Sequence, residues 1–223
     1  MTDTDLFARI KSELFTAVIG DALDVMGYRH QFLPPGLGPV QPGTRIVGRA
    51  MPVLEAAYPE GTGQGPLADQ PFGVMFQALD DLKPGEIYIT SGASLDFALW
   101  GGLMSTRAQH LGAAGAILDG YVRDTDEIRA LGFPVFARGA YAQDQGVRGK
   151  VVDFRTPITI GAVQINTGDL IVADNEGVLI IPRSAEDAAI AAAFEKVATE
   201  NKVATAIRNG MSSQEAFATF GVM

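Results

Sequence analysis

The residues best suited to chemistry lie in one stretch, from Gly101 to Asp124, with the sequence GGLMSTRAQHLGAAGAILDGYVRD. Two glycines open a short helical run, so a ligand can approach the backbone and a carboxylate or phosphate can bind the free N–H groups of the first turn. An apolar strand then leads through an Asp119-Gly120 turn to Arg123 and Asp124, which offer a guanidinium fork and a short carboxylate. Together these groups can hold a keto acid and a divalent metal ion.

Each half of this pattern also has a simpler structural explanation. The pair Gly101-Gly102 could do no more than make a tight turn into the helix. Asp124 is suited to cap the helix that follows it, and Arg123 could pair with the acids Asp126 or Glu127 at the surface. The sequence alone favours a capping role for Asp124, although capping and metal binding are compatible.

Other polar residues are weaker candidates. His110 lies on a predicted helix face and His30 near a turn, and neither has a partner at metal-ligand spacing. Ser105 lacks the strand-turn-helix setting of a serine nucleophile. Asp169 and Asp174 fall at predicted strand ends, where Asp commonly serves turns, so structural roles are expected for both.

Composition excludes several classes of function. The chain has 223 residues, a net charge of −9 and no cysteine, so a broad nucleic-acid surface, disulfides, thiolate zinc sites and a Cys nucleophile are all disfavoured. An anionic substrate therefore needs a local basic site. The N-terminal segment lacks the apolar core of a signal peptide and no stretch is long enough to span a membrane, which leads us to expect a cytoplasmic protein.

The order of elements predicts an α/β fold. Apolar spacing indicates one or two helices over residues 4–27, and a strand is expected over 45–56. A Gly- and Pro-rich loop over 58–69 follows. Strands and helices then alternate, which favours parallel pairing: a helix over 72–82, a strand through 88–90, a helix over 103–111, a strand over 115–118, a helix over 124–131 and a strand over 134–137.

After Gly149 the pattern changes to short strands, with sequences VVDF, ITI, AVQI, DLIVAD and GVLIIP, and the last two are joined by a hairpin-like turn at 175–177. Antiparallel structure packed on the α/β part is the simplest account. An Ala-rich helix is predicted over 184–208. We therefore expect a single domain over residues 1–223, with a C-terminal helical extension over about 184–223.

The string from Gly101 to Gly139, with TGDLIVADNEGVLIIP after it, resembles a family that contains two branches. These are the regulator of ribonuclease activity A and the class II pyruvate aldolases acting on 4-hydroxy-4-methyl-2-oxoglutarate and 4-carboxy-4-hydroxy-2-oxoadipate. The resemblance covers most of the chain. It implies a swivelling β/β/α architecture, an αββα-type sandwich, assembled as homotrimers or hexamers with sites at subunit interfaces.

In the aldolase branch the resemblance implies an acidic residue, twenty intervening residues, then Arg-Asp and a further acid. Arg123 and Asp124 match the substrate-binding arginine and the metal-binding carboxylate. Gly102 stands where the family usually has Asp or Glu to order a metal-bound water. Asp96, or Glu200, which matches a family glutamate that reaches a neighbouring subunit's site, could take over part of that work.

These observations lead us to expect a Mg²⁺- or Mn²⁺-dependent lyase that cleaves or decarboxylates a 2-oxo acid, with oxaloacetate decarboxylation as a side activity. The metal would bind Asp124, and the pyruvoyl carboxylate would bind at Gly101 and Gly102 and on the N–H groups of Leu103 and Met104. One rival is a lyase or isomerase of another hydroxy or sugar acid. The other is a non-catalytic ribonuclease regulator, although that branch lacks the Arg-Asp pair.

Overall fold

The computed structural model describes residues 2–58 and 67–222. Its helices are α1 (Asp3–Glu13), α2 (Thr16–Val25), α3 (Met75–Asp80), α4 (Gly102–His110), α5 (Thr125–Leu131), α6 (Glu186–Arg208) and α7 (Ser213–Phe220). Its strands are β1 (Gly38–Pro39), β2 (Ile46–Ala57), β3 (Glu86–Ser91), β4 (Ala98–Trp100), β5 (Gly115–Val122), β6 (Val135–Ala140), β7 (Gly149–Phe154), β8 (Ile158–Ile160), β9 (Val163–Ile165), β10 (Leu170–Asp174) and β11 (Gly177–Ile181). None of the described helices is long and apolar enough to cross a membrane.

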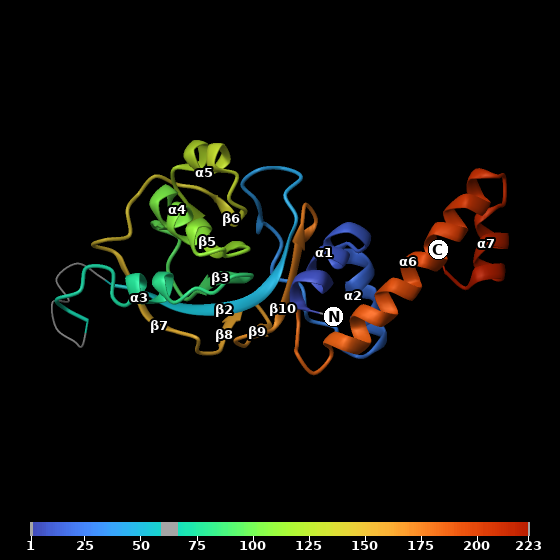
Figure 1. The fold of residues 1–223 in the computed structure, drawn as a ribbon, viewed down its shortest axis with the longest axis horizontal. Coiled ribbons are helices and arrows are strands. Elements are labelled where there is room, and N and C mark those ends of the chain that lie inside the picture. Colours follow the sequence, from blue (N-terminus) through green and yellow to red (C-terminus); the bar gives the residue numbers. More distant parts are fainter. Residues whose placement is uncertain (1, 59–66, 223) are drawn as a thin grey trace.

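One mixed sheet organises the fold, with strand order β1-β6-β5-β3-β2-β10-β11, β4 paired to β5 and β7 paired to β2 (Figure 1). The pairs β2–β3, β3–β5, β4–β5 and β5–β6 are parallel, as the alternation of strands and helices predicts. The later strands β7, β10 and β11 add antiparallel pairings. The predicted α/β class and the C-terminal helical extension are thus confirmed.

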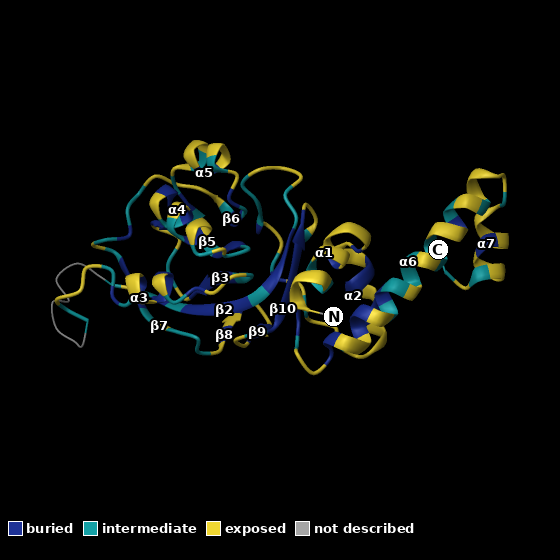
Figure 2. Cartoon of the chain, in the orientation of Figure 1, coloured by how far each residue is buried: buried dark blue, intermediate teal, exposed yellow. Residues whose placement is uncertain are grey.

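Three clusters of apolar side chains form the core. Helices α3, α4 and α5 cover one face of the sheet, the β8–β9 hairpin covers part of the other, and α1, α2 and α6 pack at the β10–β11 end (Figure 1). In Figure 2 the buried part of α6 lies near its start, and the rest of α6 and α7 extends away from the body with mostly exposed residues. The largest fully buried side chains include Trp100, Tyr88, Phe97, Phe136, Ile10, Leu14 and Ile19.

Two polar contacts hold the terminal helices to the sheet. The buried Asp174 carboxylate at the end of β10 accepts hydrogen bonds from the backbone N–H of Thr16 at 2.9 Å and from its hydroxyl at 2.8 Å, and so satisfies an N–H group at the start of α2. Arg49 on β2 binds Asp3 of α1 and Glu186 of α6. The hydrogen bonds to these two carboxylates, that to Asp3 foremost, raise the pKa of the Arg49 guanidinium above its usual value.

The structure corrects the sequence analysis in two places near Gly101. Residues Ala98–Trp100 form the short strand β4, which the sequence did not predict. The expected turn at Asp119-Gly120 lies inside β5, at an irregularity in its pairing with β6. Gly120 is needed there because a side chain would overlap Leu99 of β4. Most of the predicted loop over 58–69 lies outside the described residues.

Candidate active site

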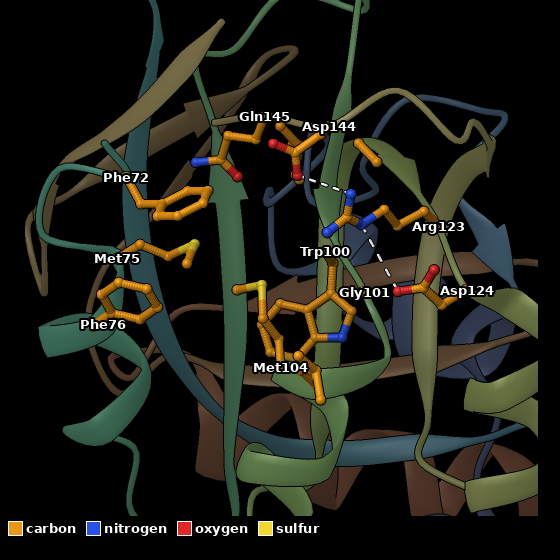
Figure 3. Close-up of a pocket in the computed structure, with 13 residues that line it drawn as sticks. Phe72, Met75, Phe76, Trp100, Gly101, Met104, Arg123, Asp124, Asp144 and Gln145 are labelled. Atoms are coloured by element: carbon orange, nitrogen blue, oxygen red, sulfur yellow. Dashed lines mark ion pairs between the residues drawn. The ribbon is translucent and has the colours of Figure 1, made fainter. Parts of the chain in front are cut away.

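A pocket of about 270 Å³ opens where β4 and β5 end and α4 begins (Figure 3). Its wall combines three charged side chains and an amide with a larger apolar surface. The lining residues are Phe72, Met75, Phe76, Ala98, Leu99, Trp100, Gly101, Leu103, Met104, Arg123, Asp124, Asp144 and Gln145. Residues around Gly101 and the pair Arg123-Asp124, both singled out in the sequence, therefore line the same pocket.

Asp124 has an unusual backbone conformation. It lies in the left-handed region with φ 57° and ψ 37° and occupies the position before the first residue of α5, yet its side chain makes no capping bond to that helix. Its Oδ2 instead accepts a hydrogen bond from the backbone N–H of Gly102 at 3.0 Å. Asp124 is therefore the N-cap residue of α5, as the capping alternative predicts, but its side chain does not make the capping hydrogen bond. The carboxylate faces the start of α4, where the partial positive charge of that helix favours an anion, and a strained conformation of this kind is typical of functional sites.

Arg123 is held by acids of the pocket and not by those that follow it in the sequence. Its Nη1 lies 2.8 Å from Oδ1 of Asp144, and its Nε lies 3.8 Å from Oδ2 of Asp124 (Figure 3). The predicted alternative of a surface pair with Asp126 does not form, because Asp126 binds Arg129 instead. The Arg123 side chain is 41% exposed, so it remains accessible to a ligand in the pocket.

The paired glycines let two acidic side chains come close to the start of α4. A Cβ at Gly101 would lie 2.7 Å from Oδ2 of Asp124, and a Cβ at Gly102 would overlap the carboxylate of Glu127. Beyond Gly102, the described residues provide no acceptor for the backbone N–H groups of Leu103 and Met104. Both residues line the pocket, so this end of α4 can accept a carboxylate, as predicted.

Glu127 lies where the resemblance implies an acidic side chain. The Glu127 carboxylate of α5 occupies the space next to Gly102 that a side chain at that position would fill. An acid is therefore present beside the start of α4, although it comes from a different helix. Sequence reasoning kept Glu127 only as one of two acids after Asp124, because no sequence pattern shows which of them turns toward Gly102.

The two remaining candidate acids lie outside this pocket. Asp96 is exposed in the turn before β4 and does not line the pocket. Glu200 lies on the protruding part of α6, where it contacts Lys196 at 3.6 Å, and α6 is far from α4 in the same chain (Figure 1). The structure of one chain therefore does not bring Glu200 to its own pocket, and a contribution of Glu200 to a neighbouring subunit's site stays a prediction.

The carboxylate oxygens of Asp124 are suited to bind a small, hard cation. Its Oδ2 is engaged by Gly102, whereas Oδ1 has no hydrogen-bond donor in residues 2–58 and 67–222. Carboxylate oxygens are the ligands that Mg²⁺ and Mn²⁺ prefer, and Mg²⁺ keeps several waters when few protein ligands are available. The same two ranges hold no group of three or more His, Cys, Asp or Glu side chains at metal-binding distances, so water would have to supply most of the ligands of a cation bound at Asp124.

The Trp100 ring at the floor of the pocket is held by hydrogen bonds and aromatic contacts. The Trp100 indole N–H donates to the Ser105 hydroxyl at 2.7 Å, and that hydroxyl also donates to the Gly101 carbonyl at 3.1 Å. The Trp100 ring stacks on Phe133 with centroids 6.3 Å apart and tilts against Tyr88 at 4.9 Å. Ser105 is fully buried, and its hydroxyl links the Trp100 indole to the Gly101 carbonyl. This structural role agrees with the sequence analysis, which did not assign Ser105 as a nucleophile.

Sequence reasoning missed the opposite wall of the pocket. Phe72, Met75 and Phe76 come from α3 and the segment before it, and Asp144 and Gln145 come from the loop between β6 and β7. The cluster of two phenylalanines and a methionine over 72–76 was the available signal. Its helical spacing also fits an ordinary core-facing helix, so the sequence did not assign it to a site.

Comparisons with known proteins identify the family of this chain. Residues 16–180 match the family model RraA-like, described as aldolase/RraA, and the chain belongs to this family. It is 30% identical over 202 residues to the protein DlpA of Legionella pneumophila, covering 90% of this chain but only 31% of DlpA. A protein of Halalkalibacterium halodurans, provisionally named 4-hydroxy-4-methyl-2-oxoglutarate aldolase, is 30% identical over 91% of this chain and 89% of its own. An uncharacterized Pseudomonas syringae protein superposes with a TM-score of 0.85 at 26% identity, covering 98% and 95% of the two chains.

A second unusual carboxyl group lies on β2. Glu55 is 2% exposed, and its Oε1 has no hydrogen-bond partner among the described residues. The group lies close to Gly149 at the start of β7. Burial raises the pKa of Glu55 from 4.5 to about 8, so the folded protein holds this group protonated at neutral pH.

This burial predicts a pH-dependent loss of stability. Between pH 4.5 and about 8 the unfolded chain has released the Glu55 proton while the folded chain retains it. Stability therefore falls as the pH rises through this range, by up to about 1.4 kcal/mol per pH unit. The variant Glu55→Gln removes the effect, so its melting temperature should exceed that of the wild type by a margin that grows from pH 5 to pH 8. Glu13→Gln, at an exposed pair on α1, is the matched control. A constant margin for Glu55→Gln across this range would contradict the assignment.

Proposed function

We propose that this protein is a divalent-metal-dependent lyase that cleaves or decarboxylates a 2-oxo acid and releases pyruvate. One observation carries the proposal. The Arg123 guanidinium, the Asp124 carboxylate and the open start of α4 meet at one end of a single pocket. Such a reaction needs a donor to the keto oxygen, a ligand for the metal ion and a binding site for the carboxylate, and Arg123, Asp124 and the start of α4 are suited to these parts in that order.

Each group has a definite part in the proposed reaction. The N–H groups of Leu103 and Met104 bind the substrate carboxylate, and Arg123 donates hydrogen bonds to the 2-oxo oxygen as negative charge develops on it. Asp124 would hold Mg²⁺ or Mn²⁺, and the cation when bound would supply further positive charge near the 2-oxo oxygen. We assign to Glu127, whose carboxylate lies over Gly102, the proton-transfer part that the family's acid plays from position 102.

We also propose a homotrimer or hexamer in which α6 of one subunit completes the site of the next. Helix α6 packs against α2 and α7, and its outer part extends with α7 away from the body (Figure 1). An Ala-rich helix with few tertiary contacts gains little stability by itself. A neighbouring subunit would bury this helix and bring Glu200 to its pocket.

The first test is removal of the metal ligand. Asp124→Ala should lower metal-dependent pyruvate release from oxaloacetate or 4-hydroxy-4-methyl-2-oxoglutarate by about 10²-fold or more, because the charge that holds the cation is lost. A lactate dehydrogenase-coupled assay measures pyruvate, and Mn²⁺ binding is followed by electron paramagnetic resonance. Asp126→Ala, whose side chain is 99% exposed two residues away, is the control and should behave as the wild type.

Full activity of Asp124→Ala in Mg²⁺ would show that the metal assignment is wrong. Absence of metal-dependent pyruvate release from the wild type would favour the rival regulator that binds a ribonuclease.

The second test concerns the acid that stands over Gly102. Glu127→Ala should lower turnover by roughly 10²–10⁴-fold, the range of a general acid–base group. Adding Gly102→Asp to Glu127→Ala returns a carboxylate to the vacated space and should recover part of the loss. Gly102→Asp alone would place its side chain against Glu127, so the double variant is the informative one. Unchanged turnover in Glu127→Ala would remove Glu127 from the mechanism.

The third test concerns the shared site. Light scattering should show a trimer or hexamer at working concentration. When the inactive variants Asp124→Ala and Glu200→Ala are co-expressed, mixed assemblies should regain part of the activity, since some sites receive an intact Asp124 and an intact Glu200 from different chains. A monomer, or mixed assemblies with no recovered activity, would exclude the shared-site arrangement.

A further inference from the structure

The pocket has two chemically different ends. One end carries Arg123, Asp124, Asp144 and Gln145, and the other is formed by apolar side chains (Figure 3). The apolar end consists of Phe72, Met75, Phe76, Leu99, Trp100 and Met104. A molecule that fills this pocket therefore needs a polar head and an apolar tail.

The apolar end is built to contact a ligand. Phe72 and Phe76 meet edge to face with ring centroids 5.5 Å apart, opposite the Trp100 ring that Ser105 holds in place. Phe76 is 57% exposed and Leu103 is 83% exposed, so apolar surface also continues along the pocket wall toward solvent. Large apolar side chains grouped in this way at a pocket are typical of a binding site for an apolar group.

The charges that this chain itself supplies to the pocket leave room for one substrate carboxylate. Within residues 2–58 and 67–222, Arg123 is the cationic side chain that lines it, and it already faces the carboxylates of Asp124 and Asp144. A divalent cation and the start of α4 can balance the carboxylate of the 2-oxo acid. A second substrate carboxylate would lie among the phenylalanines and methionines without a donor, and burying an unpaired charge there is costly.

Gln145 marks the boundary between the two ends. It is 4% exposed, and its Nε2 has no acceptor among the described residues. In Figure 3 it lies between Phe72 and Asp144. An aldol adduct of pyruvate carries a hydroxyl group between its 2-oxo acid head and its tail, and the side-chain amide of Gln145, which lines the pocket at this boundary, is suited to hydrogen-bond that hydroxyl.

We infer that the substrate is a monocarboxylic 4-hydroxy-2-oxo acid with an apolar group on C4, the adduct of pyruvate and an apolar aldehyde or ketone. This inference rests on the proposed function. In the reaction the C3–C4 bond breaks. The C4 hydroxyl loses its proton, and C4 with its oxygen becomes the carbonyl group of the apolar product. C3 of the released pyruvate gains a proton, so atoms and electrons balance without a further reactant.

The first experiment measures binding and does not depend on turnover. Titration calorimetry in excess Mg²⁺ compares 2-oxoglutarate with 5-methyl-2-oxohexanoate, in which an isopropyl group replaces the distal carboxylate. The apolar ligand should bind about tenfold more tightly or better. Equal or tighter binding of 2-oxoglutarate, or no binding of either, would overturn the inference.

A substitution at the apolar end sharpens this comparison. Phe76→Arg places a cation there and should shift the preference toward 2-oxoglutarate by about tenfold. Val25→Arg on α2 is the control, because Val25 is 90% exposed and does not line the pocket, and it should keep the wild-type preference. An unchanged preference in Phe76→Arg would also overturn the inference.

The second experiment separates this inference from the proposed function. Pyruvate release is compared for 4-hydroxy-4-methyl-2-oxoglutarate and for 4-hydroxy-4,5-dimethyl-2-oxohexanoate, its isopropyl counterpart. A higher kcat/KM for the isopropyl compound supports the inference, and a higher value for the dicarboxylate overturns it while leaving the lyase intact. If neither compound yields pyruvate and the apolar 2-oxo acid still binds more tightly, the lyase proposal fails and the pocket's preference stands.

Discussion

The hydrogen bond from the Gly102 N–H to the Asp124 carboxylate determines the geometry of the site. It joins the starts of α4 and α5, and these helices follow two strands that are paired in parallel. Only a side chain turned away from its own helix can make this bond, and the left-handed backbone at Asp124 provides that direction. The absence of side chains at Gly101 and Gly102 lets the helix start come close enough. A small shift of either helix would therefore change the positions of both Asp124 and the free N–H groups beside it.

The sequence predicted those parts of the site that depend on local pattern. A helix starting after Gly101-Gly102, a strand beginning at Gly115 and a helix after Asp124 are each specified by residues within a few positions. The alternation of these elements implies parallel strands, whose carboxyl ends lie at one edge of the sheet. That rule places the start of the helix after Gly101-Gly102 and the Arg123-Asp124 pair at the same edge of the sheet, although the contacts that join them into one pocket are not predicted by it.

The sequence could not predict what depends on distant packing. Strand β4 is three residues long and owes its conformation to β5, so its own residues carry little signal. The direction of Asp124 and the position of Glu127 over Gly102 follow from how α4 and α5 meet. Phe76 and Gln145 reach the pocket from segments that flank β3 and β7. Their residue types fit an ordinary core and an ordinary loop equally well.

The order of the strands has a consequence for how the chain folds during its synthesis. Strand β2 near the amino terminus pairs with β10, and the hydrogen bonds between Thr16 and Asp174 join positions 158 residues apart. Until β10, β11 and α6 have been synthesised, α1, α2 and the part of β2 that pairs with β10 lack these partners. An unpaired strand edge and uncovered apolar helices are prone to aggregation. The N-terminal segment is therefore exposed to aggregation until these later elements have left the ribosome.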